Sequence, residues 1–390
     1  MTESFIPYGH QLIGEDDIQA VVEVLRSPYL TTGPKVEAFE KAVCEYVRSP
    51  YGVAVSSGTA ALHAAMAAAR FAPGDEILIP TMSFLATANA ALYVGAKPVF
   101  VDSEKHGFNL DLTDAEKKIT SRTKGIVPVH FSGQPVNIEA VQALAKRHSL
   151  TVIEDAAHAL GAVSNGRPIG GLSDMTIFSF HPVKHITTGE GGMVMTSNEA
   201  LAKRLRQFRH HGIDVDVIQR DTQQRWRYDM TGLGYNYRLT DIQCALGISQ
   251  LRKSEEFLKR REAIAAAYDK AFTHAPFLER PPRGRTSDRH AWHLYIVRLK
   301  AETSGLSRDE AFEHLRSQGI GVHVHYRPIH LHPYYAALGW RPGDCPQAEA
   351  TFSAALTLPI HPSMTDAMVQ RVITAVERLP DALIVKNPVS

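Results

Sequence analysis

Residues 150–195 read LTVIEDAAHALGAVSNGRPIGGLSDMTIFSFHPVKHITTGEGGMVM, and this stretch decides the fold class. It contains three short apolar runs, which predict buried strands. These runs are 150–153, 175–180 and 192–195. Asp155 comes two residues after the first run, and Lys184 lies in the glycine-rich segment before the third. The stretch therefore predicts strands of one sheet, joined by loops that carry polar side chains.

Upstream of this stretch, strand-like and helical patterns alternate along the chain. Strands are predicted at 52–55, 76–79, 98–101 and 125–129, and helices at 15–26, from 34 onward, at 60–69, at 85–93 and after the N-cap residue Asn137. Strands that alternate with helices imply crossover connections and a mostly parallel sheet covered on both faces. Residues 1–253, including a short N-terminal arm, are therefore expected to form one large α/β domain.

Downstream, the patterns predict a smaller α/β domain over residues 254–390. Thr240 and Gln243 form a capping box that opens a helix, and a long helical stretch at 254–272 follows it. The smaller domain is expected to contain strands at 294–299 and 320–326, a helix opened by Ser307 and Glu310, and a last helix from 365.

Length and charge exclude several classes of protein. The chain has 390 residues, enough for two domains, and 42 basic against 41 acidic side chains leave a formal charge of +1. No bulk charge therefore attracts nucleic acid or a membrane surface. Three distant cysteines, Cys44, Cys244 and Cys345, fit reduced thiols. With no leader pattern and no run of about 18 apolar residues, the sequence predicts a cytoplasmic protein.

The first candidate site lies where the predicted strand 52–55 meets an Ala-rich helix. Ser57, Gly58 and Thr59 supply hydroxyls, a close approach and the free amides of a helix start. Such a segment can hold a phosphate without a lysine. An ordinary helix cap explains the same residues about equally well.

Asp155 and Lys184 are the other two candidates. A carboxylate at the carboxyl end of a parallel strand lies where ligands of α/β sheets bind, and it can pair with a protonated ring nitrogen. The alternative is that Asp155 caps the next segment. A lysine normally lies at the surface, but Lys184 follows an apolar strand and has His181 and His185 nearby. Burial and positive neighbours favour the neutral amine, which condenses with carbonyls.

Together these groups match the needs of pyridoxal 5'-phosphate (PLP). The cofactor needs a phosphate site, an acid for its pyridine nitrogen and a lysine for the Schiff base. An aromatic ring usually flanks it, and Phe84, just after the predicted strand that ends near Pro80, is placed to stack on it.

The chain resembles the DegT/StrS-type sugar-nucleotide aminotransferases, which have the aspartate aminotransferase-like fold type I. The resemblance rests on residues 57–62, Pro80, Thr81 and Phe84, 154–158, the Lys184 segment and 234–243. It implies that Lys184 is the Schiff-base lysine, that Asp155 partners the pyridine nitrogen and that His158 lies near the 3-hydroxyl. Ser57, Gly58, Thr59 and Ser179 would hold the phosphate. Asn236 would reach the phosphate of a neighbouring subunit, which implies a homodimer with shared active sites.

Within the family, the Lys184 segment resembles the branch that aminates C4 of a 4-keto sugar. That resemblance implies L-glutamate as the amino donor and a UDP-4-keto-6-deoxy-N-acetylhexosamine as the acceptor. The product would be UDP-4-amino-4,6-dideoxy-N-acetyl-beta-L-altrosamine, on the route to pseudaminic acid. The residues implied to contact the sugar nucleotide are Tyr8, Tyr29, Leu30, Thr31, His325 and Tyr326, the last two from the partner chain.

Several alternatives stay open on the sequence alone. The acceptor could be a UDP-pentose or another deoxyhexose. A sugar dehydratase of the same fold would carry histidine in place of Lys184, and a PLP-bound regulator would show no turnover. A metal site is also conceivable at His323, His325, His330 and His332, but without acidic or thiol ligands no metal is predicted. Arg225 or Arg227 could neutralise a diphosphate, although an ordinary surface loop is favoured there.

Overall fold

The computed structural model describes residues 5–214, 227–305 and 307–384, and within them a seven-stranded sheet forms the centre of the larger part. Its strand order is β1-β9-β8-β5-β4-β2-β3. The strands are β1 (Tyr51–Val55), β2 (Glu76–Pro80), β3 (Lys97–Val101), β4 (Thr123–Ile126), β5 (Thr151–Asp155), β8 (Met175–Ser179) and β9 (Gly192–Thr196). All neighbours run parallel except β9, which is antiparallel to both β1 and β8. The prediction of a mostly parallel sheet is confirmed.

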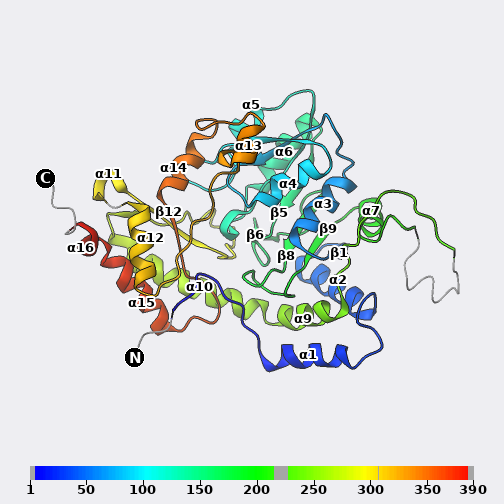
Figure 1. Cartoon of the computed structure of the whole chain (residues 1–390), viewed down its shortest axis with the longest axis horizontal. Helices are drawn as coiled ribbons and strands as arrows, with labels where there is room; N and C mark the ends of the chain where they lie inside the picture. Colours follow the sequence, from blue (N-terminus) through cyan, green and yellow to red (C-terminus); the bar gives the residue numbers. More distant parts are fainter. Residues whose placement is uncertain (1–4, 215–226, 306, 385–390) are drawn as a thin grey trace.

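Helices cover both faces of this sheet (Figure 1). The helices of this part are α1 (Glu15–Leu25), α2 (Pro34–Val47), α3 (Gly58–Ala68), α4 (Leu85–Tyr93), α5 (Leu112–Lys117), α6 (Ile138–His148), α7 (Glu199–Arg209) and α9 (Asp241–Arg252), of which α1 packs on α9. The predicted caps are present: the Asn137 side chain accepts from Ala140 N, and Thr240 forms its capping box with Gln243. A short hairpin, β6 (Val163–Ser164) with β7 (Arg167–Pro168), lies between β5 and β8 in the sequence.

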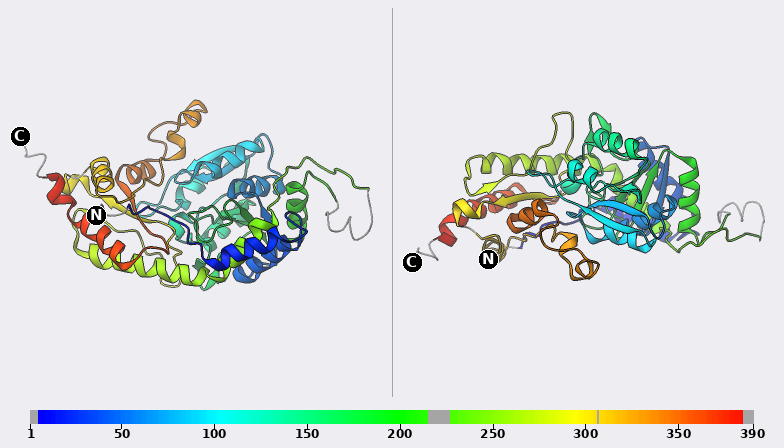
Figure 2. Two further views of the ribbon diagram at one scale, coloured as in Figure 1. Left: turned by 60° about the horizontal axis from the view of Figure 1, so that its bottom comes forward. Right: turned by 90° about the horizontal axis from the view of Figure 1, so that it is seen from above.

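The C-terminal part is built on a second, antiparallel sheet of order β10-β11-β12. Its strands are β10 (Leu278–Glu279), β11 (Tyr295–Leu299) and β12 (Ala355–Leu358). Its helices are α11 (Ala301–Ser304), α12 (Arg308–Ser317), α13 (Pro333–Ala337), α14 (Pro346–Ala354), α15 (Asp366–Glu377) and α16 (Leu379–Ile384). A long helix, α10 (Ser254–Ala271), follows α9 and runs from the large sheet to this part (Figures 1 and 2).

The N-terminal arm crosses to the C-terminal part. Ile6 is fully buried and packs in the same hydrophobic cluster as Tyr268 and Tyr295. Its amide donates to Gly319 O at 2.9 Å, and its carbonyl accepts from Gly321 N at 2.6 Å. The proposed division into domains 1–253 and 254–390 falls between α9 and α10 and stays a prediction. The arm of the first segment nevertheless packs in the core of the second.

The bounds of several predicted elements differ from the structure, and two of these differences have a clear physical reason. The helix predicted at 60–69 begins two residues earlier, because the Ser57 side chain caps it by accepting from Ala60 N. The strand predicted at 320–326 is wrong: this segment makes only isolated bridges, Ile320 with Ile6 and His323 with Thr357. Its apolar alternation reflects packing against two different neighbours instead of membership in a sheet.

Candidate active site

The carboxyl ends of three strands meet at one edge of the large sheet. Val55 of β1 and Ser179 of β8 both pair with Gly192 of β9, and Asp155 of β5 pairs with Ile177 of β8. The segments that follow β1, β5 and β8 therefore start side by side. This register brings together the three groups that the sequence singled out, although 29 or more residues separate them along the chain.

The start of α3 forms the first group. A Cβ added to Gly58 would lie 2.9 Å from Ser179 Cβ, so a side chain at this position would collide with the end of β8. Because Gly58 has no side chain, the start of α3 lies against Ser179, next to Ser57 and Thr59 in the sequence. Amides at the start of an 11-residue helix, together with hydroxyls, favour a bound phosphate.

Asp155 forms the second group and is nearly buried, at 5% exposure. Its Oδ2 accepts from Thr87 Oγ1 at 2.7 Å, and its Oδ1 accepts from Ala157 N at 3.1 Å. Thr87 lies in the first turn of α4, and Phe84 is the N-cap residue of that helix. The Phe84 ring is 56% exposed. One helix start thus fixes the acid and also presents an accessible aromatic face.

Lys184 forms the third group, in the loop between β8 and β9. The side chain is partly buried. Desolvation lowers its pKa from 10.5 to about 8, with Asp155 opposing this shift and the Arg261 guanidinium adding to it. A substantial fraction of the amine is therefore neutral near pH 8, which is the form that attacks a carbonyl.

Three buried histidines lie beside Lys184. The ring centroids of His158 and His293 are 4.3 Å apart, and those of His185 and His293 are 5.6 Å apart. Burial lowers the pKa of all three well below 6.5, and the Lys184 charge adds to this effect. Their Nδ1 atoms are buried and have no hydrogen-bond partner among the residues that the structure describes. Lys184 is therefore bordered by neutral imidazoles with unused acceptor or donor capacity.

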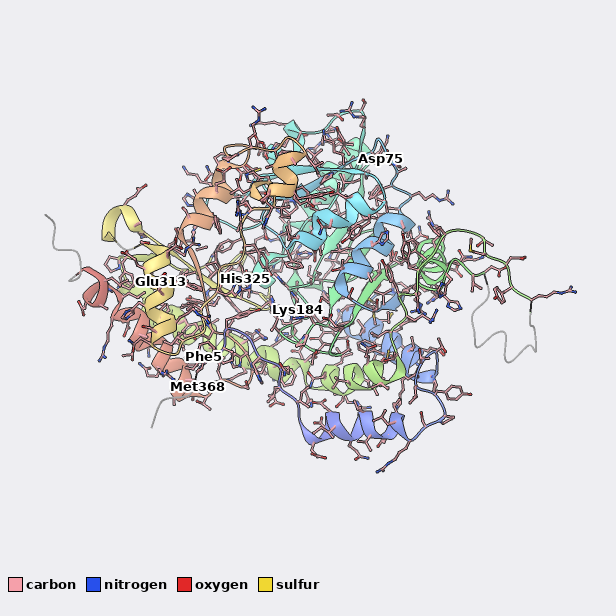
Figure 3. The ribbon with its side chains drawn as sticks, viewed as in Figure 1. Phe5, Asp75, Lys184, Glu313, His325 and Met368 are labelled. Atoms are coloured by element: carbon pink, nitrogen blue, oxygen red, sulfur yellow. The ribbon has the colours of Figure 1, made fainter. Side chains whose placement is uncertain are left out.

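His325 and Tyr326 complete the group from the C-terminal part of the same chain. The Tyr326 hydroxyl lies 3.5 Å from His158 Nε2, and its ring centroid is 5.9 Å from that of Phe84. Tyr8 packs against His325, with ring centroids 5.2 Å apart. Figure 3 shows Lys184 and His325 between the large sheet and the C-terminal part. Tyr326 thus lies beside His158 of its own chain, and the expectation that this pair contacts the sugar nucleotide from the partner chain stays a prediction.

Other expected residues lie elsewhere in the chain. Tyr29, Leu30 and Thr31 lie beside the start of α9, where Leu30 O accepts from Asp241 N, and the first two side chains are exposed. Asn236 is exposed and bridges to His210. Their roles stay predictions.

The described residues add no support for a diphosphate-binding arginine or for a metal site. Arg225 lies outside the described residues, and Arg227 is exposed. Across 5–214, 227–305 and 307–384, no group of three or more His, Cys, Asp or Glu side chains could hold a metal ion.

Sequence reasoning missed three residues of this region: Thr87, His293 and Arg261. Arg261 is 1% exposed on α10, and its Nη1 donates to the carbonyls of Trp292, His293 and Ile360. His293 lies in an irregular segment before β11, where no motif marks it. A buried threonine on an otherwise Ala-rich helix was a usable signal for Thr87, because a buried hydroxyl needs a partner.

The residues present fit PLP. Gly58 lets the start of α3 approach Ser179, Lys184 has an amine with a lowered pKa, and the nearly buried Asp155 carboxylate is bonded to Thr87, in the first helical turn after the exposed Phe84 ring. Such a site on a mostly parallel sheet defines a PLP-dependent transferase of fold type I. Residues 11–377 match the DegT/DnrJ/EryC1/StrS aminotransferase family, and the chain belongs to this family of PLP-dependent sugar aminotransferases.

Solved structures of family members superimpose on nearly the whole chain. PseC of Helicobacter pylori, an aminotransferase involved in the biosynthesis of pseudoaminic acid, is 32% identical with a TM-score of 0.90, and the match covers 97% of this chain and 100% of PseC. A Streptococcus pneumoniae protein assigned as a sugar aminotransferase, in its PLP form, is 31% identical with a TM-score of 0.90, covering 97% and 99%.

A curated relative is more similar in sequence. The spore coat polysaccharide biosynthesis protein SpsC of Bacillus subtilis is 41% identical over 375 residues, which is 95% of this chain and 96% of SpsC. Separately, no helix in the described part of the chain combines the length and apolar character needed to cross a membrane.

Proposed function

We propose that the enzyme transfers an amino group from L-glutamate to C4 of a UDP-4-keto-6-deoxy-N-acetylhexosamine. The product would be UDP-4-amino-4,6-dideoxy-N-acetyl-beta-L-altrosamine, and the enzyme would be a PseC-type transaminase of a pseudaminic acid route. The single observation that carries transamination at this site is Lys184, with its lowered pKa, beside Asp155 at the same sheet edge. The likeness to PseC and the sequence around Lys184 support the choice of sugar.

Each side chain of the site has its own role in the proposed transamination. PLP, when bound, supplies an electron sink and carries the amino group between the two half-reactions. Lys184 Nζ takes the proton from the α-carbon of glutamate and later delivers a proton to C4 of the sugar. Asp155 holds the proton on the pyridine nitrogen. The start of α3 and the Ser57, Thr59 and Ser179 hydroxyls bind the phosphate. Glutamate leaves as 2-oxoglutarate, and the sugar carbonyl oxygen leaves as water.

A panel of UDP-4-keto sugars, each incubated with the holoenzyme and L-glutamate, tests the substrate. We expect the deoxy-N-acetylhexosamine to give the largest kcat/KM and a 4-amino product by mass and NMR analysis. Lys184→Ala should abolish turnover, while Lys146→Ala, a matched change of an exposed lysine on α6, should not. Turnover by Lys184→Ala, or amination at C3, would refute the proposal.

A second candidate is a C4 aminotransferase for another nucleotide 4-keto sugar, either a UDP-pentose or a different deoxyhexose. The 41% identity with SpsC, whose name places it in spore coat polysaccharide biosynthesis, favours it. The same panel distinguishes the two candidates, because only the identity of the best acceptor differs between them.

We also propose a homodimer in which Asn236 reaches the cofactor phosphate of the partner. Its exposure, in the segment that pairs with His210, leaves the side chain available to a second chain. Mixing inactive Lys184→Ala protein with inactive Asn236→Ala protein should restore activity, because a hybrid dimer has one intact site. Mixtures that stay inactive while subunits exchange would refute the shared site. Free Cys44, Cys244 and Cys345 support a cytoplasmic location.

A further inference from the structure

Two buried hydroxyls extend from Asp155 toward the start of α4. Thr87 is fully buried and Ser83 is 3% exposed. The Ser83 Oγ and Thr87 Oγ1 atoms are 2.7 Å apart, and Thr87 Oγ1 is 2.7 Å from Asp155 Oδ2. Both distances are typical of O–H···O hydrogen bonds. The three side chains therefore form a continuous chain that ends at the carboxylate.

The direction of donation in this chain follows from a count of hydrogens. A carboxylate only accepts, so the single Thr87 proton is directed to Asp155. Thr87 then has no proton left for Ser83, and the Ser83 hydroxyl must donate to Thr87 Oγ1. The order is Ser83 to Thr87 to Asp155. Each bond polarises the next, so the second hydroxyl strengthens the donation by the first.

Backbone hydrogen bonds hold Ser83, Thr87 and Asp155 in this arrangement. Ser83 precedes the α4 N-cap residue Phe84, and Thr87 N donates to Phe84 O at 3.2 Å in the first turn. The other carboxylate oxygen of Asp155 is held by Ala157 N. Both oxygens therefore have assigned donors, and the carboxylate plane is set by two separate elements, α4 and the turn after β5.

We propose that Ser83 and Thr87 are positioning residues that orient Asp155 and withdraw negative charge from it. This inference rests on the proposed role of Asp155 as the partner of the pyridine nitrogen. A carboxylate that shares its charge with two hydroxyls holds the ring proton less tightly than an unassisted one. The hydroxyl chain thereby sets how strongly the cofactor withdraws electrons during proton transfer.

A role in packing alone would be satisfied by any side chain of the same shape. Valine has nearly the shape of threonine and lacks the hydroxyl, so Thr87→Val separates shape from donation, and Thr87→Ser restores the hydroxyl. Another buried threonine of the protein provides a matched control. Thr176 is fully buried on β8 and donates to the neighbouring carboxylate Glu154 at 3.1 Å. Thr176→Val is therefore the same chemical change at the adjacent acid.

The experiment uses the purified holoenzyme and records the visible band of the bound cofactor against pH, together with its bleaching rate by L-glutamate. Removing the Thr87 donor concentrates charge on Asp155, which favours the protonated cofactor. The Thr87→Val midpoint should therefore rise by about 0.5 pH unit, and bleaching should slow about tenfold because Asp155 loses one of the two donors that orient it. Ser83→Ala should shift the midpoint in the same direction by less, and Thr87→Ser should stay close to the wild type.

Thr176→Val should lower the Tm without moving the midpoint. An unmoved midpoint in Thr87→Val and Ser83→Ala, or an equal shift in Thr176→Val, would overturn the inference. Asp155→Asn separates the role of the two hydroxyls from the role of Asp155 itself. If it moves the midpoint while Thr87→Val does not, only the hydroxyl chain is refuted. If neither moves it, the role of Asp155 fails as well. The readout does not depend on which sugar the enzyme uses.

Discussion

Glu154 and Asp155 are consecutive carboxylates on β5 that point to opposite faces of the sheet, and their surroundings differ completely. Glu154 is fully buried, accepts from His130 Nε2 at 2.8 Å and accepts from Thr176 Oγ1 at 3.1 Å. His130 Nδ1 accepts from Val136 N at 3.1 Å, so the imidazole is neutral and both its nitrogens are used. This face is a closed hydrogen-bond network.

The face of Asp155, in contrast, carries groups whose hydrogen-bonding capacity is not fully used. Lys184 offers an amine with a lowered pKa, and His158 has a buried Nδ1 without a partner among the described residues. A closed buried network stabilises the fold, whereas a buried network with unused groups costs stability unless a ligand completes it. One residue step along β5 therefore separates a structural acid from a functional one, because alternate side chains of a strand face opposite ways.

The largest expected effect comes from Asp155→Asn. Asparagine keeps the shape and still accepts from Thr87, but it cannot hold a proton on a ring nitrogen. We expect kcat/KM to fall by about 10²–10³-fold, as for loss of a preorganised electrostatic group, with little change in Tm. Steady-state kinetics and thermal unfolding of the same preparation check this. Full activity in Asp155→Asn would remove the functional distinction between the two faces.

Glu154→Leu should give the opposite result. Leucine leaves the His130 N–H and the Thr176 hydroxyl buried without an acceptor, so we expect a loss of about 3 kcal/mol in the free energy of unfolding. The activity per folded molecule should change little. Denaturant unfolding and active-site titration together measure both quantities. A stable but inactive Glu154→Leu protein would place Glu154 in the chemistry.

The face of Asp155 also predicts a pH dependence for cofactor attachment. Only the neutral Lys184 amine reacts, and its pKa lies near 8 because of desolvation. The rate at which apoenzyme takes up PLP should therefore rise about tenfold per pH unit below 8 and level off above it. An ordinary lysine would continue to gain rate toward pH 10.5. Stopped-flow absorbance distinguishes the two profiles, and a rate that still rises steeply at pH 9.5 would contradict the lowered pKa.

The smallest effect is expected for Phe84→Leu. Phe84 is the exposed ring at the start of α4, so its loss removes stacking but leaves the Ser83, Thr87 and Asp155 bonds in place. Aromatic contacts are worth about 0.5–1.5 kcal/mol, which corresponds to roughly 2- to 12-fold weaker PLP binding. Equilibrium dialysis measures the change, with Tyr93→Leu, an exposed tyrosine on the same helix, as the control. Equal weakening in both variants would argue against stacking.

Some of this site could be predicted from the sequence for a definite reason. Parallel strands end at one edge, so a glycine-hydroxyl segment after β1, an acid at the end of β5 and a lysine after β8 had to converge. His293 and Arg261 could not be found in this way. They reach the site from an irregular segment and from α10, through tertiary packing that has no sequence period.

The segment 320–326 shows the same limit. Its apolar pattern predicted a strand. In the structure, Ile320 pairs with Ile6 of the N-terminal arm and His323 pairs with Thr357, so the two residues contact different neighbours and form no common strand. The location of Tyr326 beside His158 of its own chain depends on how this segment folds back, which local pattern does not encode.

The N-terminal arm has a consequence for how the protein is made. Ile6 is synthesised more than 300 residues before its partners Gly319 and Gly321. At about 5–20 residues per second, the arm must wait on the order of tens of seconds before its bonds can form. The buried core around Tyr268 and Tyr295 therefore closes only after the segment 319–321 has been synthesised, and it needs segments that lie more than 300 residues apart in the sequence.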